Sequence, residues 1–129
     1  MIAVVDDDEL VRTALQRLLK TFGYNVIAFE SAEEFLSCGR LPEVRCLIAD
    51  IRMPGMSGIE LQANLKADRR HIPIIFITAH GDAKMRIQAM RDGAVEFLTK
   101  PFDNAVLLET VDAAVEDYAK ALGFWNSNQ

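Results

Sequence analysis

Five polar residues of this sequence have the side-chain chemistry needed to receive a phosphoryl group. They are Asp6, Asp7, Asp50, Thr78 and Lys100, and each lies at or just after the end of a short apolar segment. Three carboxylates brought together repel one another unless a cation binds them, and their oxygens suit Mg²⁺, or Mn²⁺ in its place. In such a site Asp50 could attack phosphorus and form an acyl phosphate. A divalent cation, a lysine and a hydroxyl or backbone N–H could each neutralise one phosphoryl oxygen.

Each of these residues taken alone has an ordinary structural explanation. An aspartate at the end of a strand is usually a cap or turn residue, and acidic residues such as those at positions 6–8 suit the N-terminus of a helix. Thr78 is equally suited to capping. A lone lysine before proline, such as Lys100, is usually a surface residue. The functional hypothesis therefore depends on a fold that brings the residues together.

Five apolar segments alternate with five helical patterns along the chain. The predicted strands are residues 2–5, 24–29, 46–49, 74–77 and 95–98, and the predicted helices begin near residues 8, 31, 58, 81 and 103, the last ending near residue 122. This alternation predicts a parallel sheet with helices on both faces. Because the carboxyl ends of parallel strands meet at one edge of the sheet, the candidate residues are expected to converge there.

Local patterns predict several helix starts and core faces. Ser31–Glu34 and Ser57–Glu60 have the Ser-x-x-Glu spacing of a capping box. Apolar residues recur at helical spacing in the first and last helices, and we expect those residues to face the core. They are Val11, Ala14, Leu15, Leu18 and Phe22 in the first helix, and Leu107, Val111, Ala114 and Tyr118 in the last.

The helix predicted from about residue 81 has more apolar surface than one core face needs. Its expected core stripe is Ala83, Ile87, Met90 and Ala94. Met85 and Ala89 fall off this stripe, and methionine is common on adaptable binding surfaces. The pattern therefore predicts an interaction surface that includes Met85.

Composition indicates one globular domain. The chain has 129 residues, half of them hydrophobic, and a net charge of −5, which argues against binding of nucleic acid by this domain itself. No apolar run approaches the ~20 residues of a membrane helix, and no signal peptide is visible. Cys38 and Cys46 do not form a CxxC pattern and indicate reduced thiols in a cytoplasmic protein.

Four segments together resemble the receiver domain of bacterial two-component response regulators. They are Val4–Glu9, Asp50–Gly58, Thr78–His80 and Phe97–Phe102. The resemblance covers nearly the whole chain. Residues 77–82 and 93–98 look most like the FixJ and NarL branch, whose members usually carry a LuxR-type helix-turn-helix output domain.

The resemblance implies a fold and a role for each site residue. It implies a flavodoxin-like (βα)5 fold with strand order 2-1-3-4-5. Asp50 would be the phospho-acceptor. Asp7 and Asp50 would bind Mg²⁺ directly, Asp6 mostly through water, and the backbone carbonyl of Arg52 would be the third protein ligand.

Further roles carried by the resemblance concern the switch. Thr78 and Lys100 would contact the phosphoryl oxygens, and Phe97 would be the aromatic switch residue. The side chains of Arg52 and His80 would flank the phosphoryl group and tune its lifetime. The peptide bond between Lys100 and the following proline is expected to be cis.

The resemblance also implies partners and a boundary. The phosphoryl donor would be a sensor histidine kinase, or a small molecule such as acetyl phosphate. The chain would not be an enzyme beyond its own phosphorylation and dephosphorylation. Phosphorylation would switch the face of the fourth helix and fifth strand, promote homodimers and control a transcriptional output domain. Residues 1–122 would form the receiver domain, and residues 123–129 the start of a linker or the end of the chain. No membrane contact is expected.

Three alternatives remain open on the sequence. The segment Ile2–Asp8 fits the strand and Asp-x-Asp opening of a haloacid-dehalogenase-like, Mg²⁺-dependent phosphatase, but that family leaves the Asp50 motif unexplained and expects Thr or Val where Leu10 stands. A single-domain response regulator would act by protein contact alone. A plain interaction domain with a decayed site is disfavoured because all five candidate residues are present.

Overall fold

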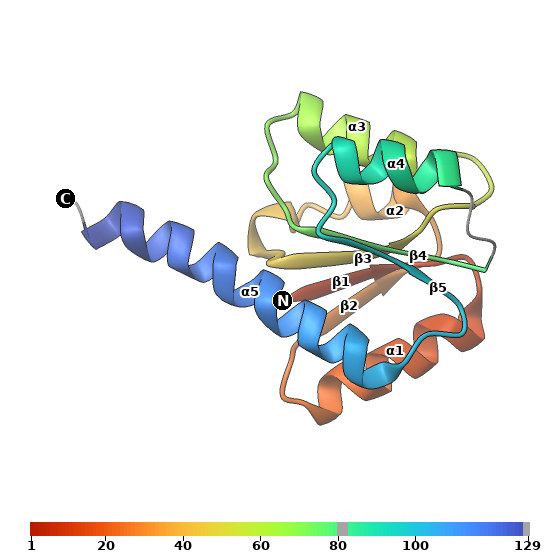
Figure 1. Cartoon of the computed structure of the whole chain (residues 1–129), viewed down its shortest axis with the longest axis horizontal. Coiled ribbons are helices and arrows are strands. Elements are labelled where there is room, and N and C mark those ends of the chain that lie inside the picture. Colours follow the sequence, from red (N-terminus) through yellow and green to blue (C-terminus); the bar gives the residue numbers. More distant parts are fainter. Residues whose placement is uncertain (80–82, 128–129) are drawn as a thin grey trace.

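The computed structural model contains a five-stranded, entirely parallel sheet (Figure 1). Its strands are β1 (Ile2–Val5), β2 (Val26–Phe29), β3 (Cys46–Asp50), β4 (Ile74–Thr78) and β5 (Glu96–Thr99). Their order across the sheet is β2-β1-β3-β4-β5. The structure describes residues 1–79 and 83–127, with side chains as far as residue 121. The predicted flavodoxin-like fold and strand order are confirmed.

Helices cover both faces of the sheet. They are α1 (Glu9–Thr21), α2 (Ala32–Leu36), α3 (Gly58–Ala67), α4 (Ala83–Arg91) and α5 (Asn104–Ser127), with a short 3₁₀ helix at Leu41–Glu43. Figure 1 shows α1 and α5 on one face and α2, α3 and α4 on the other. None of the helices in the described part of the chain is long and apolar enough to cross a membrane.

The core has two layers because successive side chains of a strand point to opposite faces. In β1, Ala3 and Val5 pack towards α2, α3 and α4, whereas Ile2 and Val4 pack towards α1 and α5. Every residue of β1, β3 and β4 is buried, which explains their lack of polar alternation. Polar side chains appear only where these strands end.

The two predicted capping boxes differ in outcome. At α3 the box is complete, because Ser57 Oγ accepts from Glu60 N and the Glu60 carboxylate accepts from Ser57 N. At α2, Ser31 Oγ accepts from Glu34 N, but the Glu34 carboxylate accepts from the backbone N of Glu30. Half of the second prediction was therefore wrong, since the acidic side chain reaches one residue further back.

The predicted core face of α5 is confirmed for three of its four residues, since Tyr118 is only partly buried, and that of α1 is only partly correct. Leu107, Val111 and Ala114 are buried. In α1, Leu15 is buried as predicted, but Ala14 is exposed and Phe22 is 61% exposed, and the buried Leu19 was not predicted. Phe22 is the residue that ends the helix, so the helical spacing no longer applies to it. The α5 helix continues to Ser127, beyond its predicted end near residue 122; the domain boundary at residue 122 stays a prediction.

The predicted orientation of α4 was wrong. Ala89 is buried and Met85 packs against the core, whereas Ile87 is 57% and Met90 38% exposed. A nine-residue helix with apolar side chains on two sides has no unique core face by periodicity. A tertiary contact determines which side of α4 faces the core: Gln62 Nε2 of α3 donates to the carbonyl of Ala89 at 3.0 Å. The exposed large hydrophobic residues of α4 are therefore Ile87 and Met90.

Candidate functional site

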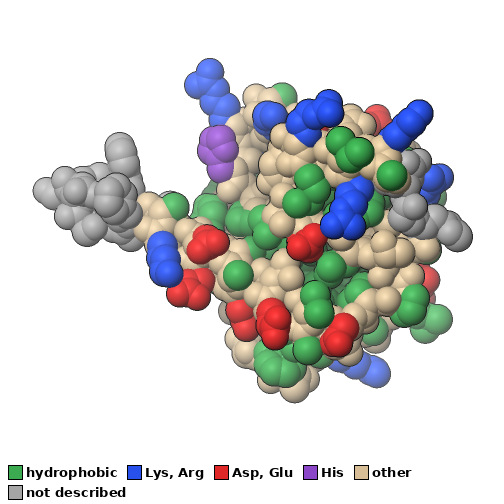
Figure 2. Space-filling view, in the orientation of Figure 1, with side chains coloured by type: hydrophobic (Ala, Val, Ile, Leu, Met, Phe, Trp, Pro, Cys, Tyr) green, Lys and Arg blue, Asp and Glu red, His purple; other side chains and the backbone are tan. Residues whose placement is uncertain are grey.

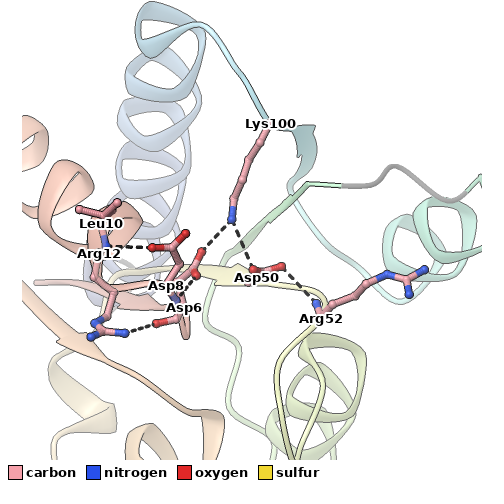
Figure 3. A network of polar contacts seen from close by, with 7 residues as sticks. All are labelled: Asp6, Asp8, Leu10, Arg12, Asp50, Arg52 and Lys100. Atoms are coloured by element: carbon pink, nitrogen blue, oxygen red, sulfur yellow. Dashed lines mark hydrogen bonds and ion pairs between the residues drawn. The ribbon is translucent and has the colours of Figure 1, made fainter.

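The turn between β1 and α1 carries three consecutive aspartates with different environments. Asp6 is fully buried, whereas Asp7 and Asp8 are exposed. Asp8 caps α1, because its Oδ1 accepts from Leu10 N at 2.9 Å. The backbone N of Asp8 in turn donates to Asp6 Oδ1 at 2.9 Å (Figure 3). The turn thus directs Asp6 into the molecule and leaves Asp7 open to solvent.

Asp50 ends β3 and is 7% exposed. Its Oδ1 accepts from the backbone N of Arg52 at 3.1 Å, which fixes the start of the following loop. The N-terminus of α3 packs directly behind this residue: Gly58 N donates to Ile51 O at 2.8 Å. A Cβ atom on Gly58 would lie 2.5 Å from the Asp50 carbonyl oxygen. Glycine at this position therefore allows the close approach that positions Asp50.

Lys100 joins the two buried carboxylates. Its Nζ lies 3.1 Å from Asp6 Oδ2 and 3.4 Å from Asp50 Oδ2 (Figure 3). The backbone N of Lys100 donates to Thr78 O at 2.7 Å, which ties the end of β5 to the end of β4. The peptide bond between Lys100 and Pro101 is cis, as expected.

The electrostatics of the site favour an additional cation. Burial, and then the charge of Asp6, raise the pKa of Asp50, although the Arg52 N–H and Lys100 act against that rise. Burial acts to lower the pKa of Lys100, but its bonds to Asp6 and Asp50 outweigh burial and raise that pKa. Lys100 is therefore charged at neutral pH. One ammonium group leaves the ionised form of Asp50 less favourable than in water.

Three carboxylates are close enough to share a metal ion. Ligand atoms of Asp6, Asp7 and Asp50 lie within 4.8 Å of one another. These hard oxygen donors suit Mg²⁺, and the exposure of Asp7 leaves room for the water molecules that Mg²⁺ retains. The backbone of Arg52 lies beside Asp50 through the hydrogen bond from its N–H. The donor set therefore fits the predicted cation.

The remaining predicted residues lie around this cluster. Thr78 is 1% exposed at the end of β4, the strand next to β3. Phe97 in β5 is 4% exposed, and its ring packs against Phe76 with centroids 6.5 Å apart. The side chain of Arg52 is exposed and points away from Lys100 (Figure 3). His80 lies outside the described residues.

Sequence reasoning missed two residues that shape the site. Gly58 allows the contact between α3 and the end of β3. Arg12 of α1 donates through Nη1 to the carbonyl oxygen of Asp6 at 2.7 Å. A signal for Arg12 was present, since a cation one helical turn after a cluster of acids can reach back to it.

A family model described as "Response regulator receiver domain" matches residues 2–112. Nodulation protein W of Bradyrhizobium diazoefficiens is 47% identical over 117 residues, which cover 90% of this chain and 51% of that protein. The transcriptional regulatory protein FixJ of Rhizobium meliloti is 44% identical over 120 residues, covering 92% and 58%. The structure of the response regulator StyR superposes with a TM-score of 0.90 at 45% identity, covering 98% of this chain and 64% of that one.

This chain belongs to the receiver domain family of two-component response regulators. Members take part in phosphorylation-based signalling, interact with histidine kinases, generally bind Mg²⁺ and are generally not classical enzymes. The chain spans about half the length of the curated relatives it matches. The matches do not favour the phosphatase alternative.

Proposed function

We propose that this domain accepts a phosphoryl group on Asp50 from the phosphohistidine of a sensor kinase, in the cytoplasm, and thereby switches its α4–β5 face. The observation that carries this proposal is the position of Lys100 Nζ between the buried carboxylates of Asp6 and Asp50. The pair of acids, the lysine and the exposed Asp7 all meet at the carboxyl edge of the sheet, where ligands of open α/β sheets bind.

The side chains divide the work of phosphoryl transfer. Asp50 Oδ1 is held by the N–H of Arg52, while Oδ2 faces Lys100. Attack by an Asp50 oxygen forms the O–P bond as the P–N bond to the donor histidine breaks. Asp6, Asp7, Asp50 and the carbonyl of Arg52 would hold Mg²⁺, or Mn²⁺ in its place. When bound, the cation supplies positive charge against the phosphoryl oxygens.

The switch depends on residues beside the acceptor. Phosphorylation adds charge and three acceptor oxygens, which the Lys100 ammonium and the Thr78 hydroxyl then contact. Movement of Thr78 opens space behind it, into which Phe97 turns. Both arrangements exist before phosphorylation, and the modification shifts their populations. The side chains of Arg52 and His80 would tune the lifetime of the acyl phosphate.

The α4–β5 face has the character of an interaction surface. Ile87 and Met90 of α4 are exposed on it. Hydrophobic side chains are interspersed with Lys and Arg over α4 in Figure 2. We propose that this face forms a homodimer once Asp50 is phosphorylated. A transcriptional output domain, as the name of the FixJ relative suggests, would then respond through a linker that begins near residue 123.

An apolar groove beside Lys100 supports docking of a kinase. It has a volume of about 240 Å³ and lies between α1 and the start of α5. Its lining residues are Val11, Ala14, Leu15, Leu18, Lys100, Pro101, Phe102 and Asn104. A partner seated there would bring its phosphohistidine towards Asp50.

The proposal is tested by locating the phosphorylation. Incubation with radiolabelled acetyl phosphate and Mg²⁺ should label the chain, and hydroxylamine should release the label, as expected for an acyl phosphate. Asp50→Asn should abolish labelling. Asp68→Asn, an exposed aspartate at the end of α3, should label normally. Label that appears at Asp6 and survives Asp50→Asn would overturn the proposal.

A further inference from the structure

The turn between β1 and α1 concentrates negative charge where the cation is proposed to bind. Only Asp6, Asp7 and Asp8 join the last residue of β1 to the first residue of α1. Asp6 and Asp7 both belong to the carboxylate group whose ligand atoms lie within 4.8 Å. Like charges so close together repel one another. The backbone of this turn therefore needs contacts that hold it against that repulsion.

Each of the three oxygen atoms of Asp6 has its own donor (Figure 3). Lys100 Nζ contacts Oδ2 at 3.1 Å, and Asp8 N donates to Oδ1 at 2.9 Å. The third donor is Arg12, whose Nη1 reaches the backbone carbonyl oxygen at 2.7 Å. This contact is the shortest of the three and involves a charged donor, which strengthens a hydrogen bond.

The Arg12 contact differs from the other two because it does not occupy an oxygen of the Asp6 carboxylate. Lys100 and the Asp8 N–H both occupy oxygens of the Asp6 carboxylate, where they share these atoms with any bound ion or water. Arg12 occupies only the carbonyl oxygen. It can therefore hold the turn whether the site is occupied or empty, without competing for a carboxylate oxygen.

Arg12 is itself anchored on a rigid element. Its backbone N donates to the Asp8 carbonyl at 3.0 Å, in the first turn of α1. The helix is fixed to the core by the buried side chains of Leu15 and Leu19. The guanidinium therefore links the packing of α1 to the peptide that leads from Asp6 to Asp7.

We propose that Arg12 is a positioning residue for the divalent cation, because its hydrogen bond to the Asp6 carbonyl holds the carboxylates of Asp6 and Asp7 in place before the ion binds. This inference rests on the proposed function above. The charge of Arg12 repels a cation, so the positioning effect and the charge effect on affinity have opposite signs. A substitution that removes both therefore reveals which effect is larger.

The test compares metal affinity among variants of the whole chain. Arg12→Met keeps the aliphatic stem but removes the donor, Arg12→Lys keeps a charged donor, and Arg17→Met removes an exposed arginine from the same helix. Affinity is measured for MgCl₂ by thermal-shift titration and for MnCl₂ by electron paramagnetic resonance. We expect Arg12→Met to lower the affinity for both ions roughly tenfold, which is the lower end of the range for groups that orient metal ligands. Arg12→Lys should recover part of the affinity, and Arg17→Met should match the wild type.

The outcomes separate this inference from the function on which it rests. A wild-type chain that binds neither ion overturns the proposed cation site and this inference with it. Wild-type binding together with equal or tighter binding by Arg12→Met overturns the role of Arg12 alone, as does an equal loss in Arg17→Met. If circular dichroism shows that Arg12→Met does not fold, Arg12→Leu, which also lacks a donor, replaces it with the same expectation.

Discussion

The surroundings of Asp50 act on its pKa in two opposite directions. Burial and the charge of Asp6 raise its pKa, while the Arg52 N–H and Lys100 stabilise the ionised form. Because the pKa of Asp50 is higher in the folded chain than in the unfolded one, the folded state binds more protons between the two values. Without a divalent cation, the contribution of Asp50 to stability therefore falls as pH rises through that window.

Replacement of Asp50 by asparagine tests the predicted direction of this pH dependence. Asp50→Asn should raise the melting temperature at pH 7 in the presence of EDTA, because it removes a carboxylate that repels Asp6 and leaves the contact of Lys100 with Asp6 intact. The gain should shrink as pH falls through the raised pKa of folded Asp50 and should be lost near about 4, the pKa of an unfolded aspartate. Thermal unfolding followed by circular dichroism between pH 3.5 and 7.5 measures it. A destabilised variant at pH 7 would contradict the prediction.

Divalent cations should make the wild type more stable than Asp50→Asn, the reverse of the order expected in EDTA. An ion present at ten times its dissociation constant stabilises the folded state by about 1.4 kcal/mol, or roughly 4 °C for a chain of this size. We expect this shift for the wild type with MgCl₂ and a much smaller one for Asp50→Asn and for Asp7→Asn. CaCl₂ titrated in parallel serves as a control for the specificity of the ion. An equal shift in all three chains would show that Mg²⁺ acts elsewhere.

Gly58 is the first residue of α3 and lies directly against the backbone of Asp50. Alanine at this position would place its Cβ 2.5 Å from the Asp50 carbonyl oxygen and 2.9 Å from the Ile51 Cα. We expect Gly58→Ala to destabilise the chain by about 1–3 kcal/mol and also to slow labelling by acetyl phosphate, because the backbone of Asp50 must move. Urea denaturation and the labelling rate measure the two effects.

Ser57 provides the matched control. Ser57→Ala removes the cap of α3 one residue away and should destabilise by about 1 kcal/mol. It makes no contact that displaces Asp50, so labelling should stay normal. If both variants lose labelling in proportion to stability, the close contact at Gly58 has no specific effect on the acceptor.

At the scale of elements, three helices end in the same way. In α1, α3 and α4 the three backbone N–H groups that follow the last helical residue donate to carbonyl oxygens near the end of that helix. The residue that needs a positive φ is Gly23 after α1 and Gly93 after α4, but Arg69 after α3, with a φ of 57°. Arg69 is the positive-φ residue other than glycine among the described residues.

Arg69→Gly should therefore stabilise the chain. Left-handed backbone is unfavourable for residues with a Cβ and is the usual place for glycine at a helix end. The greater freedom of glycine in the unfolded state offsets part of the gain, so we expect about 0.5–1 kcal/mol by urea denaturation. Gly23→Arg makes the opposite change at the end of α1 and should destabilise by a similar amount. A loss of stability in Arg69→Gly would contradict the argument.

The elements differ in how far the sequence predicts them. Strands buried on both faces, such as β3 and β4, are continuous apolar runs and were predicted closely. The convergence of Asp6, Asp50 and Lys100 followed from parallel strands alone. The core face of α4 was mispredicted, because the hydrogen bond from Gln62 to Ala89 that orients it joins residues far apart in the chain. Gly58 was missed because its close contacts with Asp50, Ile51 and Phe76 exist only in the folded chain. Arg12 was missed although it lies only six residues from Asp6 and a local signal for it was present.

At the scale of the whole molecule, the exposed side of α4 offers a residue whose substitution tests the proposed dimer. Ile87 is 57% exposed on the proposed interface. Ile87→Lys should weaken the phosphorylation-dependent dimer at least tenfold in analytical ultracentrifugation with beryllofluoride, because a charge would enter an apolar contact. Phe22→Lys, which changes a residue 61% exposed at the end of α1, should dimerise like the wild type. Equal loss in both variants, or none in Ile87→Lys, would remove this face as the interface.

The α5 helix extends away from the body of the domain (Figure 1). Its middle is fastened twice, by a hydrogen bond from Tyr24 to Asp112 and by the guanidinium of Arg45 stacked 5.2 Å from the Tyr118 ring. Burial, then the bond to Asp112, raise the pKa of Tyr24 to about 12, so its hydroxyl remains a donor at physiological pH.

These two attachments make α5 a rigid arm. Its 24 residues span about 36 Å at the rise of an α-helix. A rotation of the domain by about 5° therefore moves the far end of the arm by about 3 Å. In the proposed dimer, paired through the α4–β5 faces, the angle of pairing would set the distance between the two arm tips. A rotation too small to matter at Asp50 would then change that distance by several ångströms.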